Sequence, residues 1–237
     1  MKRLNSRLPH STDMKYRCLV FDHDDTTVNS TATIHHPCFE RFLEEYYPGR
    51  QCGLEEYFIK NFSPGFISMC REEYGMDDKM IEIEGQFWRS YVQGKIPKAY
   101  DGIREIMEEQ KRQGGLIAVI SHSYRDNILR DYEANSLPVP DLAFGWEMPP
   151  EKRKPALWPL QEVLQRFNLH PEQVLMIDDL KPGYDMARGC GVPFAAAGWA
   201  NDIPEIESFM RQNCDLYFKQ VRELAEYLFK TVGKGEA

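Results

Sequence analysis

The stretch CLVFDHDDTTVNS, residues 18–30, sets a short apolar run directly before three closely spaced aspartates. The run RCLVFD, residues 17–22, is typical of a buried strand, because it is short, apolar and followed by polar residues. A strand that ends at Asp22 places this carboxylate at the edge of a sheet, and Asp24 can face the same crevice. One carboxylate can then attack a substrate or bind a cation while the other moves a proton. An acidic turn that caps the next element is the alternative interpretation.

Composition indicates a globular protein with a substantial core. The chain has 237 residues, of which 42% are hydrophobic and 28% are charged. Its net charge of -8 argues against nucleic acid or an anionic membrane as the main partner, because such partners attract an excess of Lys and Arg. We expect neither of these partners, and a monomer or homodimer.

Several features of the chain favour a cytoplasmic location. No apolar run approaches the ~18 residues that suggest a membrane helix. Residues 1–13 lack the apolar centre of a secretory signal and are interpreted as an N-terminal tail. The six cysteines form no C-x-x-C pair and no metal-like spacing with histidine, which indicates free thiols in a reducing compartment.

Short apolar runs alternate with helical patterns along most of the chain. Beyond the first strand, the runs interpreted as buried strands are residues 116–121, 142–146, 174–178 and 193–198. A helical pattern that follows Asp101 ends at two glycines, as helices commonly do. The alternation predicts an α/β fold with a Rossmann-like parallel sheet and helices on both faces, formed by residues 14–32 and 99–237.

Residues 33–98 interrupt this alternation. They contain helical patterns separated by Pro and Gly, and no convincing strand. An insertion directly after the first strand stands over the carboxyl ends of the strands, where open α/β sheets bind ligands. The sequence therefore predicts an inserted α-helical cap domain.

Polar residues also follow three of the later strands. Ser121 ends the second strand, where its hydroxyl and nearby N–H groups can bind an oxyanion. Lys154 lies between the third strand and a helix, from which it can reach the same crevice. Asp178 and Asp179 end the fourth strand, and adjacent carboxylates repel one another unless a cation or donor compensates them, which favours a hard divalent metal. Taken alone, a serine at a strand end is usually a cap, a lysine here is more often solvated, and an aspartate often caps the following helix.

In combination, these residues resemble the motifs of the haloacid dehalogenase superfamily, in particular its phosphatase-like members. The motifs are D-x-D-x-T (Asp22, Asp24, Thr26), a serine after an apolar strand (Ser121), K-P (Lys154, Pro155) and an acidic pair followed by G-x-x-x-A (Asp178, Asp179, Gly183, Ala187). They occur in the expected order, and the resemblance covers about residues 15–228. The insertion is similar to the helical cap of phosphoglycolate phosphatase and beta-phosphoglucomutase relatives.

The resemblance implies a role for each motif residue. Asp22 would attack phosphorus and form an aspartyl-phosphate, and Asp24 would protonate the leaving alcohol and then deprotonate the attacking water. Ser121 and Lys154 would bind the phosphoryl group, and Thr26 would support the phosphate-binding loop.

The resemblance also implies a Mg²⁺ site. The ligands would be Asp22, the backbone carbonyl of Asp24, and Asp179, with Asp178 supporting Asp179 or binding in its place. The substrate would be a small phosphorylated metabolite.

Some positions depart from the family pattern. Asp25 stands where the motif often has glycine and is expected to point away from the phosphate. His122 and His23 either contact phosphate or substrate, or are hydrogen-bonded loop residues. Lys152 competes with Lys154, although the proline that follows favours Lys154.

The predicted function is that of a Mg²⁺-dependent phosphatase. A dehalogenase expels halide without a proton, so Asp24 argues against one. A phosphomutase of the beta-phosphoglucomutase type keeps Asp24, and the motifs do not separate it from a phosphatase. A phosphoryl-accepting signalling module and a non-catalytic binding module are less favoured, the first by motif order and the second by the intact motif residues.

Overall fold

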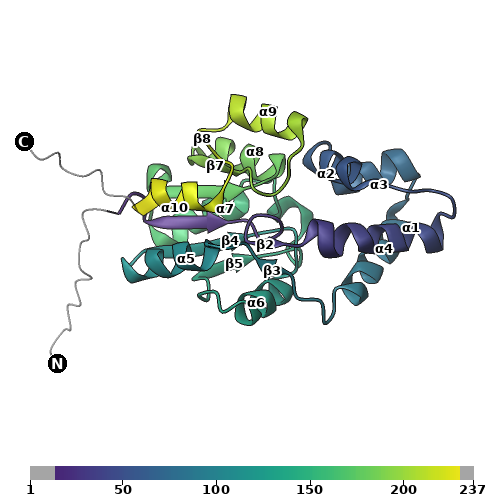
Figure 1. The fold of residues 1–237 in the computed structure, drawn as a ribbon, viewed down its shortest axis with the longest axis horizontal. Coiled ribbons are helices and arrows are strands. Elements are labelled where there is room, and N and C mark those ends of the chain that lie inside the picture. The colour runs from purple at the N-terminus through teal and green to yellow at the C-terminus, as the bar shows by residue number, and fades with distance from the viewer. Residues whose placement is uncertain (1–13, 230–237) are drawn as a thin grey trace, which may run out of the picture.

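A six-stranded parallel sheet in the order β5-β4-β1-β6-β7-β8 forms the centre of the protein (Figure 1). The computed structural model describes residues 14–229, so the expected tail, residues 1–13, lies outside the described residues. The strands are β1 (Cys18–Phe21), β4 (Leu116–Ile120), β5 (Leu142–Phe144), β6 (Val174–Asp178), β7 (Phe194–Ala197) and β8 (Leu216–Phe218). The predicted α/β fold with a parallel sheet is confirmed.

The five predicted strands are all present, with ends within two residues of the predicted ones. The sixth strand, β8, was not predicted. It has three residues, and two of them are only half-buried at the edge of the sheet, so no continuous buried run marks it in the sequence.

Six helices cover the two faces of this sheet. They are α5 (Ile103–Arg112), α6 (Arg125–Ala134), α7 (Trp158–Phe167), α8 (Lys181–Cys190), α9 (Pro204–Asn213) and α10 (Val221–Phe229). Leu19 and Phe21 of β1 pack with apolar residues of α5, α6 and α10, whereas Cys18 and Val20 pack with those of α7, α8 and α9. Alternate side chains of one strand therefore lie in two cores, as a doubly covered sheet requires.

A two-stranded antiparallel ribbon, β2 (Val28–Asn29) and β3 (Lys98–Ala99), marks the base of a second helical unit. We call residues 30–97, between these strands, the insertion. It contains a π-helical turn (Thr31–His35) and helices α1 (His36–Tyr46), α2 (Leu54–Phe62), α3 (Phe66–Tyr74) and α4 (Asp78–Tyr91). Figure 1 shows these helices gathered at one end of the sheet.

The insertion contacts the rest of the protein on two sides. On one side α2 meets α9, where the rings of Phe62 and Phe209 lie 5.3 Å apart in an edge-to-face arrangement. On the other side α4 meets the start of α6, where Arg89 forms an ion pair with Asp126 and lies 4.3 Å from the centre of the Tyr124 ring. The insertion therefore lies against the sheet unit on both sides.

Two predictions that concern the whole chain can be compared with the described residues. None of the helices within residues 14–229 combines the length and apolar character needed to cross a bilayer. The six cysteines all lie in this range and are free thiols.

Candidate active site

The predicted site residues meet at the carboxyl ends of three neighbouring strands. Asp22 directly follows β1, Ser121 directly follows β4, and Asp178 ends β6. Because β4 and β6 flank β1 in parallel register, these three positions lie side by side. Lys154 reaches the same point from the segment between β5 and α7.

Lys154 lies between two carboxylates. Its Nζ donates to Asp22 Oδ1 at 2.6 Å and to Asp178 Oδ2 at 2.7 Å, and the residue is 6% exposed. Burial disfavours the ammonium, but the two carboxylates outweigh it and raise the pKa of Lys154. Lys152, its rival in the sequence, lies with its Nζ 4.5 Å from the centre of the Trp158 ring instead.

Asp22, Asp178 and Asp179 form a buried cluster, in which one oxygen from each lies within 4.8 Å of the others. Burial raises the pKa of Asp22, with Asp178 and Asp24 adding to the rise and Lys154 opposing it. Asp179 accepts a hydrogen bond from Thr26 Oγ1 at 3.1 Å and forms no direct ion pair within residues 14–229, although the charge of Lys154 acts on it from nearby. Carboxylate oxygens suit a hard divalent cation, so these residues fit a site for such an ion.

The glycine of the fourth motif allows a helix to approach the cluster closely. A Cβ atom at Gly183 would lie 2.0 Å from Asp178 Oδ2, so no other residue fits here without displacing this carboxylate. The backbone N–H of Leu180, just before α8, donates to Asp178 Oδ1 at 2.8 Å. Asp178 is thus held by Lys154 on one oxygen and by the start of the helix on the other.

Three donors surround the carboxylate of Asp24. Ser123 Oγ donates to one oxygen at 2.6 Å, while Ser30 Oγ and His35 Nε2 each lie 2.8 Å from the other. Burial disfavours its charge, but His35, His23 and the hydroxyl of Ser123 hold the pKa of Asp24 below its usual range. Asp24 is therefore a carboxylate in this arrangement.

His35 is oriented by a side chain from the far end of the insertion. Trp88 Nε1 donates to His35 Nδ1 at 3.0 Å, and the two rings stack with centroids 5.7 Å apart. Since an indole N–H only donates, His35 Nδ1 must be unprotonated, and Nε2 carries the hydrogen that points to Asp24. This bond opposes double protonation of the imidazole, whereas the charge of Asp24 favours it.

Asp25 adopts a left-handed backbone conformation, with φ of 56°, at the position where the family motif often has glycine. Its Oδ1 accepts hydrogen bonds from the N–H groups of Ser30 at 3.2 Å and Thr31 at 3.1 Å. Burial raises the pKa of Asp25 to about 6. The extra carboxylate therefore faces the first residues of the insertion.

The remaining predicted residues make contacts within the protein. Ser121 Oγ accepts from the N–H of Ser123 at 3.0 Å. His122 Nε2 lies 2.9 Å from the carbonyl oxygen of Lys154, to which it donates, and burial lowers the pKa of His122 to about 4. His23 Nε2 lies 3.1 Å from a carboxylate oxygen of Asp131 in α6. Both histidines are hydrogen-bonded loop residues in this structure.

Comparison with protein families identifies the family of the chain. Residues 19–197 match the model of the haloacid dehalogenase-like hydrolase family. The chain belongs to this family. The predicted resemblance is thereby confirmed, and so is the prediction that the protein is an enzyme.

Individual relatives of the hydrolase are distant. It is 25% identical over 208 residues to a phosphoglycolate phosphatase of Pasteurella multocida, an alignment that covers 82% of this chain and 92% of the relative. A haloacid dehalogenase-like hydrolase of Streptococcus pneumoniae has a TM-score of 0.72 at 20% identity, covering 90% of this chain and 98% of the other. CbbY of Rhodobacter sphaeroides, solved in complex with xylulose-(1,5)-bisphosphate, has a TM-score of 0.66 at 16% identity, covering 88% and 96%.

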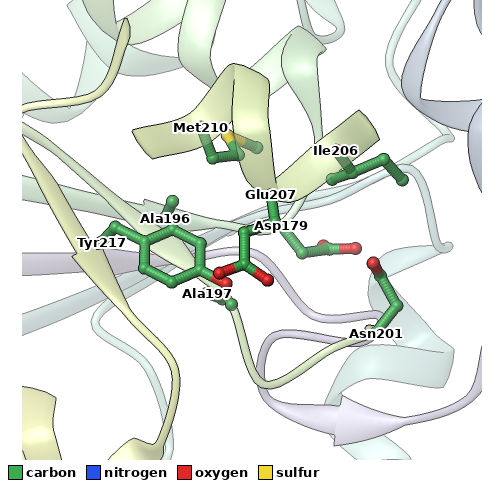
Figure 2. Close-up of a pocket in the computed structure, with 9 residues that line it drawn as sticks. Asp179, Ala196, Ala197, Asn201, Ile206, Glu207, Met210 and Tyr217 are labelled. Carbon is green, nitrogen blue, oxygen red and sulfur yellow. The ribbon is translucent and has the colours of Figure 1, made fainter. Parts of the chain in front are cut away.

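Two pockets border different aspartates of the hydrolase's candidate site. The first borders Asp179 between β7, β8 and α9, and Figure 2 shows its carboxylate between the Tyr217 ring and Glu207. The second borders Asp24 between the insertion and α6, with Trp88 and Asn127 in its wall. The second pocket therefore joins Asp24 to residues of the insertion.

Several residues of this site were not predicted. Ser30, Ser123 and His35 surround Asp24, and Asp131 binds His23. Ser123 had a usable signal, since it lies two residues after Ser121 in the same loop. The others had none, because their contacts depend on how the insertion and α6 fold back onto the loop.

Proposed function

We propose that this hydrolase is a Mg²⁺-dependent phosphatase that acts on a small phosphorylated metabolite through an aspartyl-phosphate on Asp22. The observation that carries the proposal is the position of Lys154, whose Nζ lies within 2.7 Å of both Asp22 and Asp178, with Asp179 in the same cluster. A buried lysine beside a carboxylate nucleophile can neutralise the charge that an arriving phosphoryl group adds.

The phosphoryl group enters where the strand ends converge. Asp22 attacks phosphorus, and the bond to the leaving oxygen breaks as the bond to Asp22 forms. Lys154 compensates the negative charge on both partners. Ser121, at the end of β4, and the loop that contains Thr26 supply hydrogen bonds to the phosphoryl oxygens.

Asp22, Asp179 and the backbone carbonyl of Asp24 are the proposed metal ligands. Asp178 already has both oxygens engaged, by Lys154 and by the N–H of Leu180. Asp179 has a single hydroxyl donor, Thr26, which leaves it free to bind an ion. Magnesium supplies positive charge that offsets the repulsion between the nucleophile and the phosphate.

Asp24 is the proposed acid and base. Its ionised form can remove a proton from the water that hydrolyses the aspartyl-phosphate, and the proton it gains is then available for the next leaving alcohol. The pocket beside it, bordered by Trp88 and Asn127, is the proposed place of the leaving group. We accordingly propose that residues 33–98 form a cap domain over the site.

The relatives support a small substrate. One is named for phosphoglycolate, and the structure of CbbY holds a sugar bisphosphate. The phosphomutase alternative is not favoured, since the relative from Pasteurella multocida is a phosphatase.

A screen of phosphorylated metabolites with and without magnesium tests the proposal. We expect phosphate release that requires the metal, with one group of esters clearly preferred by kcat/KM. Asp22→Asn should abolish it while the circular dichroism spectrum stays unchanged, because the amide is a poor nucleophile of similar shape. Turnover by Asp22→Asn at near the parent rate would rule out the aspartyl-phosphate, and isomerisation of a hexose phosphate without phosphate release would restore the mutase.

A further inference from the structure

Residues 23–25 form the acidic loop after β1. They contact the two chain connections that join the insertion to the sheet, residues 30–31 and residues 92–99. Asp24 and Asp25 bind the first connection, at Ser30 and Thr31. His23 reaches the second connection through side chains of α6. The proposed phosphatase chemistry does not use this second set of contacts.

The first of these contacts joins the loop to α6. His23 Nε2 lies 3.1 Å from Asp131 Oδ2, and both residues are buried. Since an ionised carboxylate only accepts, His23 Nε2 carries the hydrogen. The imidazole also stacks on Tyr132, with ring centroids 5.9 Å apart. The residue between Asp22 and Asp24 is thereby fixed against α6.

The next contact extends from α6 to the insertion. Arg130 Nε donates to Asp131 Oδ1 at 2.8 Å, while Nη1 donates to the carbonyl of Val92 and Nη2 to that of Lys95, each at 3.1 Å. These carbonyls lie where α4 ends and the second connection begins. The planar guanidinium can bind a carboxylate and two carbonyls at once, which the single ammonium of lysine cannot match in geometry.

Asn135, which directly follows α6, binds the rest of the connection. Its Nδ2 donates to the carbonyl of Pro97 at 3.0 Å, and its Oδ1 accepts from the N–H of Ala99 at 2.8 Å. Backbone groups of the connection at both ends of residues 92–99 are therefore bonded to side chains of α6 and of the residue that caps it.

We propose that His23, Asp131 and Arg130 are positioning residues that couple the placement of the insertion to the orientation of the loop bearing Asp22 and Asp24. The loop and the second connection are bonded to the same helix. An insertion that moves away from the site must therefore break the bonds of Arg130 to the carbonyls or disturb the contact between Asp131 and His23. The kinetic part of this inference rests on the proposed phosphatase function, and its structural part does not.

The kinetic test compares two esters in Arg130→Met, which keeps the apolar stem and loses the donors. An unactivated metabolite ester needs the enclosed site, so its kcat/KM should fall about 10-fold or more, because misplacement of reacting groups is costly. For para-nitrophenyl phosphate, whose leaving group needs little help, the fall should stay below about threefold. Arg125→Met is the matched control, since Arg125 is exposed on the same helix and its side chain has no partner within residues 14–229.

Hydrogen exchange supplies a readout that needs no catalysis. In Arg130→Met the amides of Val92, Lys95 and Ala99 should exchange about 10-fold faster or more, because the connection opens locally, while those of β6 stay unchanged. His23→Leu should give the same increase, since Asp131 loses a donor. His23→Gln, whose amide can donate to Asp131, should restore slow exchange.

Unchanged exchange in the connection, in both Arg130→Met and the more conservative Arg130→Lys, overturns the proposal. An equal fall in kcat/KM for both esters, with unchanged hydrogen exchange in the connection, also overturns the proposal, because that pattern indicates general damage to the protein. Should Arg130→Met fail to fold, Arg130→Lys and His23→Leu carry the same comparison. A parent protein that hydrolyses no phosphate ester refutes the phosphatase function, and the exchange rates then decide the positioning role by themselves.

Discussion

Glu84 links the interior of the insertion to the pH dependence of stability. It lies in α4 and is 6% exposed, and burial raises the pKa of Glu84 to about 7, with His35 acting in the opposite direction. The folded protein thus binds a proton at the Glu84 carboxylate more tightly than the unfolded chain does, because the glutamate pKa stays near 4.5 in the unfolded chain. The free energy of unfolding must therefore fall as the pH rises from about 4.5 to about 7.

The size of this change in the free energy of unfolding follows from the shift in the pKa of Glu84. A rise from 4.5 to about 7 corresponds to about 3 kcal/mol, at about 1.36 kcal/mol for each pKa unit. Most of it, about 2 to 3 kcal/mol, develops between pH 5 and pH 8. Glu84→Gln keeps the size of the side chain and removes its ionisation. The stability of this variant relative to the parent should rise by that amount between the two pH values.

Urea unfolding at pH 5 and pH 8, followed by circular dichroism, measures the difference. Any packing cost of the amide is the same at both pH values and cancels in the comparison. Glu82→Gln, an exposed glutamate of the same helix, is the control and should show a difference below about 0.5 kcal/mol. If Glu84→Gln shows the same stability change at both pH values, burial does not perturb Glu84 as described.

Two further substitutions test the acidic cluster. Lys154→Met should abolish phosphate release and lower the free energy of unfolding by about 3 to 5 kcal/mol at neutral pH, because it leaves Asp22 and Asp178 buried without their cation. Urea unfolding in EDTA measures this loss of stability, and a loss below about 1 kcal/mol would contradict the prediction. Thr26→Val should weaken magnesium binding about 10-fold by removing the donor to Asp179, as titration calorimetry can show, whereas Thr26→Ser should bind like the parent.

Local signals in the sequence were sufficient to predict the strand ends and the residues that follow them. Asp22, Ser121 and Asp178 each end or follow an apolar run, so their convergence required only a parallel sheet. Lys154 was chosen over Lys152 because of the proline after it, and it is Lys154 that contacts the carboxylates. The short strands β2, β3 and β8 were missed, because two or three residues carry no periodic pattern.

Contacts between distant segments were beyond such reasoning. Trp88 bonds to a residue 53 positions earlier, and His23 to one 108 positions later. Asp25 illustrates a different limit. The sequence showed a residue other than glycine in a tight loop, but only the structure shows that its carboxylate binds the N–H groups of Ser30 and Thr31. The contacts of Asp24 with Ser30 and His35 likewise depend on the fold of the insertion, which the sequence alone did not show.

The contact between α2 and α9 would give an opening of the proposed cap a thermal signature. Phe58 and Phe62 are buried in the same apolar cluster as Met210 of α9, so separating the two helices carries aromatic surface into water. Newly hydrated apolar surface increases the heat capacity, by about 0.45 cal/K/mol for each Å². An opening step consequently has an activation enthalpy that changes with temperature, and its Eyring plot is curved. The proposed bond breaking at Asp22 would expose no such surface and would give a straight line, so the shape of this plot would identify which of the two steps limits the rate of turnover.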